Sequence, residues 1–284
     1  MFHVPISDNA DKRERIEFSH IINDSADERT WRNDRNISLE NIKINVFISG
    51  DFSLIVENMS FKPVYGDFCV LPPRMLHYGR VLRKTKLDYY QLDIGLNAFD
   101  GIPGGHEMLS QLADTYRGEN VFVRPAQSEA KLFLDIVSKL ELAVAHKEMS
   151  LAFAYCIEAI AKMNELSRAG KKGVVRYLSP HISTAVAYIE ENFSRPISIE
   201  EIAEVCKISR SYLTRKFKEE IGVSVHDYIT NLRMLKATHL LGEKSVAETA
   251  FLLGFCDSSH FISVFKKVFG TTPTSYLSST RYVR

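Results

Sequence analysis

The chain has 284 residues, 45% apolar and 25% charged, a length and composition that suit two domains with separate cores. Its net charge is only +1, so a nucleic-acid partner must be argued from local patterns. Four scattered cysteines without a C-x-x-C pair predict buried thiols and no zinc site. The charged N-terminus is unlike a signal peptide, and no run of about 18 apolar residues predicts a membrane span. We therefore expect a cytoplasmic protein without a cofactor.

The first third of the chain has the patterns of short β-strands. From Ile42 to Ile48, aliphatic residues alternate with others such as Lys43 and Asn45. Further apolar runs occupy 54–56, 68–71 and 87–94. Turn signals rich in Gly, Pro, Asn and Asp separate these runs. Strands at this spacing predict a sandwich or a small barrel.

Helical patterns follow at 106–116, 128–146 and 150–167. In the second of them, an apolar residue recurs at every fourth position and forms one stripe. The stripe consists of Leu132, Ile136, Leu140 and Val144. We predict a homodimer through this helix, the next one, or both; the alternative is that the stripe packs only on its own barrel. The glycine- and lysine-rich stretch from Ala169 to Gly173 then predicts a linker.

The last hundred residues contain an internal repeat, with one copy at 198–229 and another at 245–277. Each copy begins with a predicted capping box, Ser198 with Glu201 and Ser245 with Glu248. A small alanine follows in each short helix, where a second helix can cross closely. The turn after it is one residue longer in the second copy. New helix caps are then predicted at Ser209 and Asp257.

The second helix of each copy has one apolar stripe. Leu213, Phe217 and Ile221 form the stripe in the first copy, and Phe261, Phe265 and Phe269 form it in the second. Gly222 and Gly270 end these helices in the left-handed conformation that glycine adopts easily. A short helix, a tight turn and a second amphipathic helix predict a helix-turn-helix unit. Residues 225–241 should form one long helix that joins the two units.

The outward faces of the two second helices carry the candidate DNA-binding residues. These are Arg210, Ser211, Thr214, Arg215 and Lys218 in the first copy, and Ser258, Ser259, Ser263, Lys266 and Lys267 in the second. We expect Arg215 to read a base edge and Lys266 to contact a phosphate. The alternative is a plain helical repeat with a solvated charged face. Two capped units in matching register favour DNA binding.

These motifs closely resemble the AraC/XylS family of transcription activators, over residues 182–277. The matching runs include ISIEEIA, SRSYLTRKFKEEIGVS and GFCDSSHFISVFKKVFGTTPTSY. The resemblance implies seven helices, two half-modules in adjacent major-groove segments, and σ-dependent promoters with RNA polymerase as a further partner. The chain departs from the family pattern at Lys207, where glycine is common, and at Ser263 and Leu277, where arginine is frequent. The recognition helix of the second unit is therefore expected to contact bases more weakly than that of the first unit.

The segment YGDFCVLPP at 65–73, with the later His77, resembles the cupin-like barrel that precedes many such DNA modules. A metal-dependent cupin enzyme would need clustered ligands, but His77 has no H-x-H partner, and His20 and His106 lie outside the predicted strands. No catalytic motif is present, so we expect neither an enzyme nor a metal site. The candidate effector contacts are Trp31, Arg35, His77 and Tyr89, with Arg74, Tyr78 and Tyr90 also considered. The alternative is that these aromatics are ordinary core residues.

The sequence therefore predicts an α+β fold in three parts. Residues 1–168 form a cupin-like β-barrel with a helical dimerisation segment, 169–180 a linker, and 181–284 an all-α domain with two helix-turn-helix motifs. The predicted function is a DNA-binding transcription activator that responds to a neutral sugar or short oligosaccharide. Two alternatives remain: a regulator controlled by a protein partner, and a cupin or DNA-repair enzyme fused to a DNA module. The scattered cysteines argue against the repair enzyme.

Overall fold

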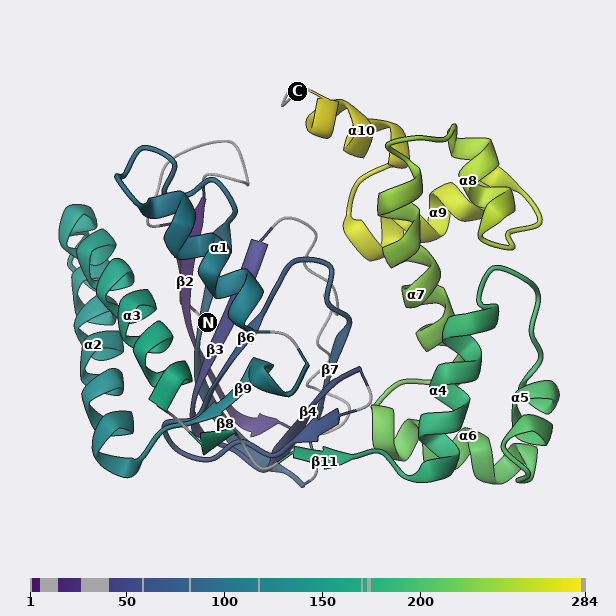
Figure 1. Ribbon diagram of the computed structural model, residues 1–284, viewed down its shortest axis with the longest axis horizontal. Coiled ribbons are helices and arrows are strands. Elements are labelled where there is room, and N and C mark those ends of the chain that lie inside the picture. The colour runs from purple at the N-terminus through teal and green to yellow at the C-terminus, as the bar shows by residue number, and fades with distance from the viewer. Residues whose placement is uncertain are drawn as a thin grey trace.

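The computed structural model describes residues 2–5, 15–26, 41–57, 59–81, 83–116, 118–169, 171–172 and 175–281. Within these ranges the predicted α+β class is confirmed. Figure 1 shows layers that follow one another across the molecule: a pair of long helices, two β-sheets, and a helical C-terminal region. No helix in the described ranges combines the length and apolar character needed to cross a membrane.

The strands that the structure describes before residue 178 pair into two antiparallel sheets. The large sheet contains, in order, β1 (Phe2–Pro5), β2 (Ile16–Ala26), β8 (Thr85–Gly95), β3 (Asn41–Ser49), β6 (Phe68–Leu71), β9 (Phe122–Arg124) and β10 (Lys171–Lys172). The small sheet contains β11 (Val175–Tyr177), β5 (Met59–Phe61), β4 (Phe52–Val56) and β7 (His77–Val81). The four predicted strand runs lie in β3, β4, β6 and β8. The described strands pair into two separate sheets and not into one closed barrel, so the cupin-like barrel stays a prediction.

Both faces of the large sheet are covered. Ile42, Ile44 and Val46 pack into the core that the sheet shares with the helices. Phe47, on the other face of β3, packs into the core between the two sheets. Period-two alternation is typical of a half-buried strand. Here the second sheet covers the remaining face, so the residues between the aliphatic positions are buried as well.

Three α-helices cover the outer face of the large sheet: α1 (Gly105–Thr115), α2 (Gln127–Ala145) and α3 (Met149–Ala169), with the 3-10 turn η1 at Gly118–Val121. All three follow the predicted ranges closely. Three members of the α2 stripe, Ile136, Leu140 and Val144, are buried in the chain's own core. Leu132 is 57% exposed. The stripe therefore serves mainly intramolecular packing, and only Leu132 remains available to a second copy.

Between residues 180 and 281 the structure describes seven helices: α4 (Pro180–Asn192), α5 (Ile199–Val205), α6 (Arg210–Ile221), α7 (Val225–Leu240), α8 (Val246–Leu252), α9 (Ser258–Phe269) and α10 (Pro273–Arg281). They enclose two apolar cores, one beneath α6 and one beneath α9. Helix α7 contributes to both cores and is the predicted connecting helix. Because one rigid helix takes part in both cores, it sets the spacing of the two units.

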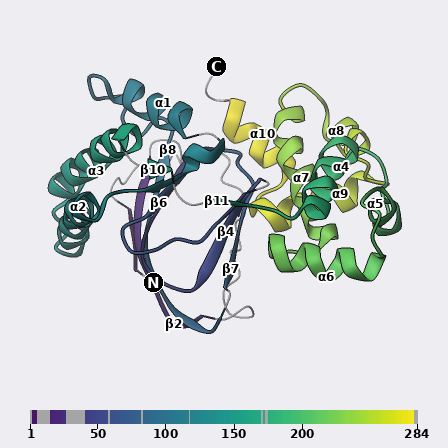
Figure 2. The same ribbon diagram turned by 60° about the horizontal axis from the view of Figure 1, so that its bottom comes forward.

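The stretch predicted as a linker carries two short strands. Lys171 pairs with Arg124 on β9, and Val175 pairs with Phe61 on β5. This stretch therefore crosses from the edge of the large sheet to the edge of the small sheet before α4 begins. Figure 2 shows β4 and β7 of the small sheet between the large sheet and the C-terminal helices.

Candidate nucleic-acid interface and sensor site

The turn between α5 and α6 is held by local hydrogen bonds. The Ser198 hydroxyl accepts from the amide of Glu201 at 3.1 Å, and Ser209 accepts from the amide of Tyr212 at 3.2 Å. The chain reverses at Lys207, whose φ of 55° lies in the left-handed region. The amide of Ile208 closes the turn on the carbonyl of Ala203 at 3.0 Å. Both predicted N-caps of the first unit are thus confirmed.

The second unit repeats this turn. Gly254, with φ of 73°, occupies the place of Lys207, and the amide of Phe255 bonds the carbonyl of Ala250 at 3.0 Å. Asp257 caps α9 by accepting from the amide of His260 at 2.7 Å. The extra residue is Cys256, which is exposed, so the prediction of buried thiols is wrong for this cysteine. An inserted turn residue has no core position to fill, which is the reason for its exposure.

The two short helices begin differently. In the second unit, Ser245 and Glu248 form both halves of the predicted capping box. In the first, the Glu201 carboxylate accepts from Arg195 and Tyr188. The hydrogen bond from Arg195 is the largest of the effects that hold the pKa of Glu201 near 2. This bond ties the start of α5 to the loop after α4.

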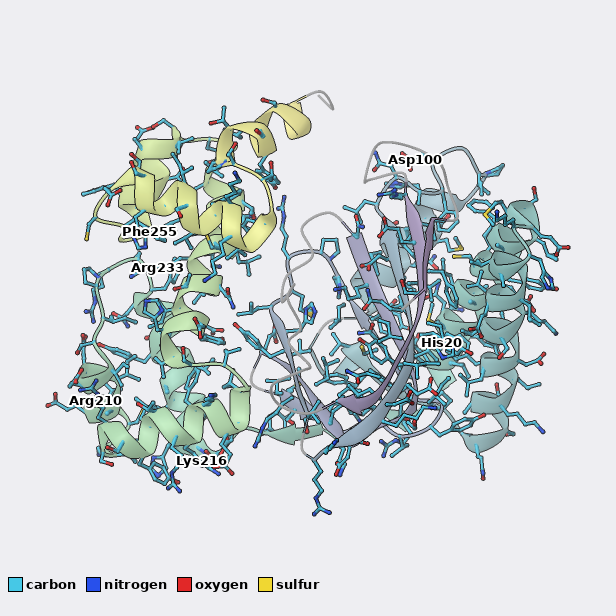
Figure 3. The ribbon with its side chains drawn as sticks, turned by 180° about the vertical axis from the view of Figure 1, so that it is seen from behind. His20, Asp100, Arg210, Lys216, Arg233 and Phe255 are labelled. Carbon is cyan, nitrogen blue, oxygen red and sulfur yellow. The ribbon has the colours of Figure 1, made fainter. Side chains whose placement is uncertain are left out.

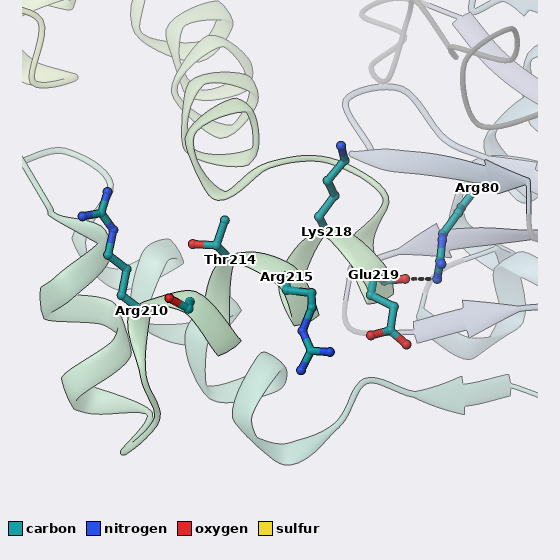
Figure 4. A pocket seen from close by; sticks show the side chains of 7 residues that line it. Arg80, Arg210, Thr214, Arg215, Lys218 and Glu219 are labelled. Carbon is teal, nitrogen blue, oxygen red and sulfur yellow. Dashed lines mark hydrogen bonds between the residues drawn. The ribbon is translucent and has the colours of Figure 1, made fainter.

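Helix α6 presents a polar face to solvent. Its apolar stripe, Leu213, Phe217 and Ile221, is completely buried. All five predicted DNA-binding residues of this helix are exposed, and they line one open hollow (Figure 4): Arg210, Ser211, Thr214, Arg215 and Lys218. The hollow also contains Glu219 and Arg80, and Arg80 comes from β7. The structure therefore brings the first predicted set together.

Two arginines of this face have partners on the protein. The Arg210 guanidinium lies 2.7 Å from the Glu200 carboxylate on α5. Arg215 lies over the ring of Tyr212, 5.7 Å from its centroid. Both contacts are on the surface and weakly held, so DNA can compete for either side chain.

Helix α9 presents the second predicted set. Ser259, Ser263, Lys266 and Lys267 are exposed, and Ser258 is half-buried. The two lysines lie in the last turn of the helix, where positive charge is favourable. Phe261 and Phe265 are buried below them.

Sequence reasoning assigned no role to Arg233, on α7. Its guanidinium donates to the carbonyls of Phe193 at 2.8 Å and Arg195 at 3.0 Å, and it lies 5.6 Å from the ring centroid of Phe255. Figure 3 shows Arg233 and Phe255 side by side between the two units. Arg233 therefore fixes the second turn relative to the first unit. The sequence shows only a charged residue in an amphipathic helix, and this gives no such signal.

The predicted effector contacts separate into three groups. Trp31 and Arg35 lie outside the described residues. His77 and Tyr89 face the space between the two sheets, and both are buried. Tyr78, Tyr90 and Arg74 face elsewhere: Tyr78 packs on Tyr228, the Tyr90 hydroxyl donates to Glu141 on α2, and Arg74 lies near His239. Neighbouring residues of a strand point to opposite faces, so only one of Tyr89 and Tyr90 can point inward.

His77 is only 1% exposed. Its Nδ1 lies 3.0 Å from the carbonyl of Met75, which can only accept, so Nδ1 carries the proton of the neutral ring. Burial, together with the charge of Lys43, lowers the pKa of His77 to about 3. Its Nε2 is then a bare acceptor without a hydrogen-bond partner.

Polar rows on the large sheet face this histidine, and sequence reasoning missed them. Register places Gln91 between Ser19 and Asn45 on the neighbouring strands, and Asp93 opposite Lys43. Lys43 is 6% exposed, and the Asn45 carboxamide oxygen has no partner. In the sequence these residues alternate with aliphatic ones, as on a solvent-facing strand. Only the second sheet makes them an interior surface.

His20 corrects another expectation, because it lies in β2 and not outside the strands. Its ring nitrogens lie 2.6 Å from Glu141 and 2.8 Å from Asp88 (Figure 3 labels His20). This group joins the large sheet to α2 on the side away from the small sheet. No set of His, Cys, Asp or Glu in the described ranges is arranged to hold a metal ion.

Comparisons with known proteins find similarities that include the C-terminal region. Residues 202–279 match a helix-turn-helix domain family. The transcriptional activator RhaS of Enterobacter sp. (strain 638) is 28% identical over 62% of this chain and 64% of its own. The melibiose operon regulatory protein of Escherichia coli K12 is 31% identical over 40% of this chain and 38% of its own. The chain thus spans less than two thirds of the length of these relatives.

One similar solved structure is a transcriptional regulator of Chromobacterium violaceum, described as containing an AraC-type DNA-binding domain. The two sequences are 30% identical, and the match covers 37% of this chain and 96% of the Chromobacterium violaceum chain, with a TM-score of 0.35.

Proposed function

We propose that α6 and α9 bind adjacent major-groove segments of double-stranded promoter DNA, because the chain belongs to the AraC/XylS family of transcriptional regulators. The observation that carries this proposal is the polar face of α6, whose five exposed residues line one open hollow above a buried stripe. The protein acts as a cytoplasmic transcription activator, with RNA polymerase as its partner at the promoter. It is not an enzyme, because the matched relatives are transcriptional regulators.

The residues have different roles in this complex. Arg210, Ser211, Thr214 and Arg215 lie toward the N-terminal part of α6, the part that approaches base edges in helix-turn-helix proteins. Arg215 is the strongest candidate for bidentate contact with guanine. Lysines near the helix ends contact phosphates. In α9, serines occupy the positions nearest the bases, so the second unit contributes more to affinity than to specificity.

Selection from a random-sequence DNA library with the full chain tests this function. We expect one duplex family to be enriched and to bind about 10³-fold or more tightly than mixed-sequence DNA, the usual ratio for specific complexes. Failure to enrich any sequence, with the chain folded, would refute sequence-specific DNA binding. The selected duplex then serves as the probe for the variants below.

The polar residues between the two sheets, beside His77, are the proposed effector site. A polyhydroxylated ligand needs donors and acceptors together with an apolar face. His77 supplies an acceptor, Asn45 and Lys43 supply polar groups, and Tyr89 supplies an aromatic ring. Lys43 lies opposite Asp93, so the site has no net charge from this pair and suits a neutral sugar or short oligosaccharide.

A thermal-shift panel of neutral sugars, uronic acids and fatty acids tests the ligand class, because a ligand of the native state raises the unfolding temperature. We expect a neutral sugar to stabilise the wild-type chain, and Asn45→Ala to lose that shift. Ser53→Ala, on the outer face of the same sandwich, is the matched control. A shift with only charged or lipid ligands would overturn the sugar assignment. No shift with any compound would favour the alternative of a controlling protein partner.

Strand β7 is the proposed route from this site to the DNA. His77 points inward, and the next residue, Tyr78, points outward. Its ring lies 5.9 Å from that of Tyr228, and its hydroxyl accepts from Asn231 at 3.4 Å. Both partners lie on α7, which joins the two DNA-binding units. A ligand that prefers one position of β7 would shift the balance between two DNA-binding states.

We also propose a homodimer through the outward face of α2. Leu132 and Leu142 are both exposed, and between them Asp135 and Lys139 form an ion pair at 2.8 Å. Leu132 and Leu142 lie at equal sequence distances on either side of Val137, and so do Asp135 and Lys139. An antiparallel two-fold contact would therefore place leucine on leucine and aspartate on lysine, the self-complementarity that such symmetry requires.

A further inference from the structure

An arginine of the N-terminal domain reaches the DNA-facing side of α6. Arg80 lies on β7, on the outer face of the small sheet. It lines the same hollow as Arg210, Arg215 and Lys218 (Figure 4). We propose that Arg80 donates to a phosphate of the bound DNA, so that the sensor domain supplies part of the DNA-binding surface.

The position of Arg80 is fixed by the end of α6. Its Nη1 donates to the carbonyl of Glu219, in the last turn of the helix. A methyl group added at Gly222, which follows the helix, would lie 3.5 Å from the Cβ of Arg80. Strand and helix end are therefore in direct contact. A cation bonded to a C-terminal carbonyl is favourable there, so the contact positions the guanidinium in advance of DNA binding.

The location within the hollow selects a phosphate and not a base. The N-terminal part of a recognition helix points at base edges, whereas its far end lies near the sugar–phosphate backbone. Arg80 and Lys218 both lie at this far end. A planar guanidinium with five N–H donors matches the geometry of a phosphate.

The acidic residue of the hollow does not oppose this arrangement. The Glu219 carboxylate lies 3.4 Å from the Lys216 ammonium, and Glu220 lies 3.1 Å from the same group. Lys216 therefore offsets part of the negative charge beside Arg80. Arg80 and Lys218 thus bring positive charge to this end of the hollow, where a DNA strand would pass.

Two other roles for Arg80 predict different measurements. If Arg80 only joins the two domains, its loss weakens binding without removing a phosphate contact. If the N-terminal domain blocks the hollow, its loss strengthens binding. Each phosphate contact releases counterions, so the slope of log K against log salt concentration separates these roles from the proposed one.

The experiment uses the full chain and the selected duplex, and it rests on the proposed DNA-binding function. Affinity is measured by fluorescence anisotropy over a salt series for wild type, Arg80→Ala, Arg80→Lys, Lys218→Ala and Arg83→Ala. We expect the slope to fall by about 0.9 for Arg80→Ala and for Lys218→Ala. Arg80→Lys should keep it. Arg83→Ala is the matched control, because it removes the same charge from a side chain that is 86% exposed and pairs with Asp51 at 3.8 Å.

An unchanged slope for Arg80→Ala, or tighter binding by this variant, would overturn the inference. If Lys218→Ala lowers the slope but Arg80→Ala does not, the proposed DNA-binding function is supported and the role of Arg80 is refuted. If wild type enriches no duplex, the proposed function itself falls, and the inference with it. Unfolding midpoints of all variants confirm that the comparison is between folded proteins.

Discussion

Replacing Lys207 by glycine should stabilise the first helix-turn-helix unit. Lys207 adopts φ of 55°, and Gly254 adopts 73° at the equivalent turn. A left-handed conformation costs a non-glycine residue about 1–2 kcal/mol. Glycine removes this cost, but its more flexible unfolded chain offsets about 0.4–1 kcal/mol of the gain. The net expectation for Lys207→Gly is about 0.5–1 kcal/mol of added stability, since the side chain is exposed and has no core contact to lose.

Urea denaturation of the full chain, followed by circular dichroism, measures this change. Lys207→Ala is the matched control: it removes the same charge and keeps the strained backbone, so it should stay near wild type. The reverse change, Gly254→Ala, should be destabilising, because its Cβ would lie 2.8 Å from the carbonyl oxygen of Ser194 in addition to the unfavourable φ. Equal gains from Lys207→Gly and Lys207→Ala would refute the backbone argument and assign the effect to charge.

Three further predictions concern DNA, pH and assembly. Arg215→Ala should lose about 1–3 kcal/mol of binding free energy on the selected duplex and relax the sequence preference at one base pair. Lys266→Ala should weaken binding to all DNA sequences alike and lower the salt slope by about one. Equal losses of affinity for selected and mixed DNA in Arg215→Ala would contradict the base-reading role of Arg215. Burial holds the pKa of His77 at about 3, below the pKa of the same side chain in the unfolded chain. The contribution of the neutral ring to the free energy of unfolding is therefore fully present above about pH 6.5. It is lost as the pH falls towards 3, by at most about 1.4 kcal/mol per pH unit. His77→Gln should flatten this acid dependence in denaturation series, and an identical pH profile would show that His77 is not responsible. Leu132→Asp should convert the proposed dimer to a monomer in sedimentation of the full chain, while Leu151→Asp, at an exposed leucine on α3, should not; a monomeric wild type at tens of micromolar would count against the interface.

The DNA-binding units were predictable because their determinants are local. Ser209 and Asp257 cap the helices that begin at the next residue, and the apolar stripes repeat within single helices. The extra residue of the second turn was also visible by simple alignment of the two copies. Each of these features depends on chain neighbours alone, so no knowledge of the tertiary structure was needed.

The proposed effector site was less predictable because it depends on pairing between distant strands. The alternation around Lys43 and Asn45 gives the two faces of β3, but it does not show that a second sheet covers the polar face. For the same reason, the sequence offers Tyr78 and Tyr90 as pocket residues, although strand parity directs them to other layers. The sequence does not predict a strand at His20, because β2 mixes apolar and polar residues without a period that holds along its length.

The alternation of β7 would give a short path between the proposed ligand and DNA contacts. His77 faces the space between the sheets, while Tyr78 and Arg80 face the DNA-binding domain. Ligand contact at His77 and DNA contact at Arg80 would therefore act on residues of one five-residue strand. A rigid strand cannot shift one face without the other, because its side chains alternate on a single backbone. By thermodynamic linkage, a sugar that changes operator affinity must have its own affinity changed by the operator to the same extent. Loss of that reciprocal effect in Tyr78→Ala, with both separate affinities retained, would place the coupling in β7.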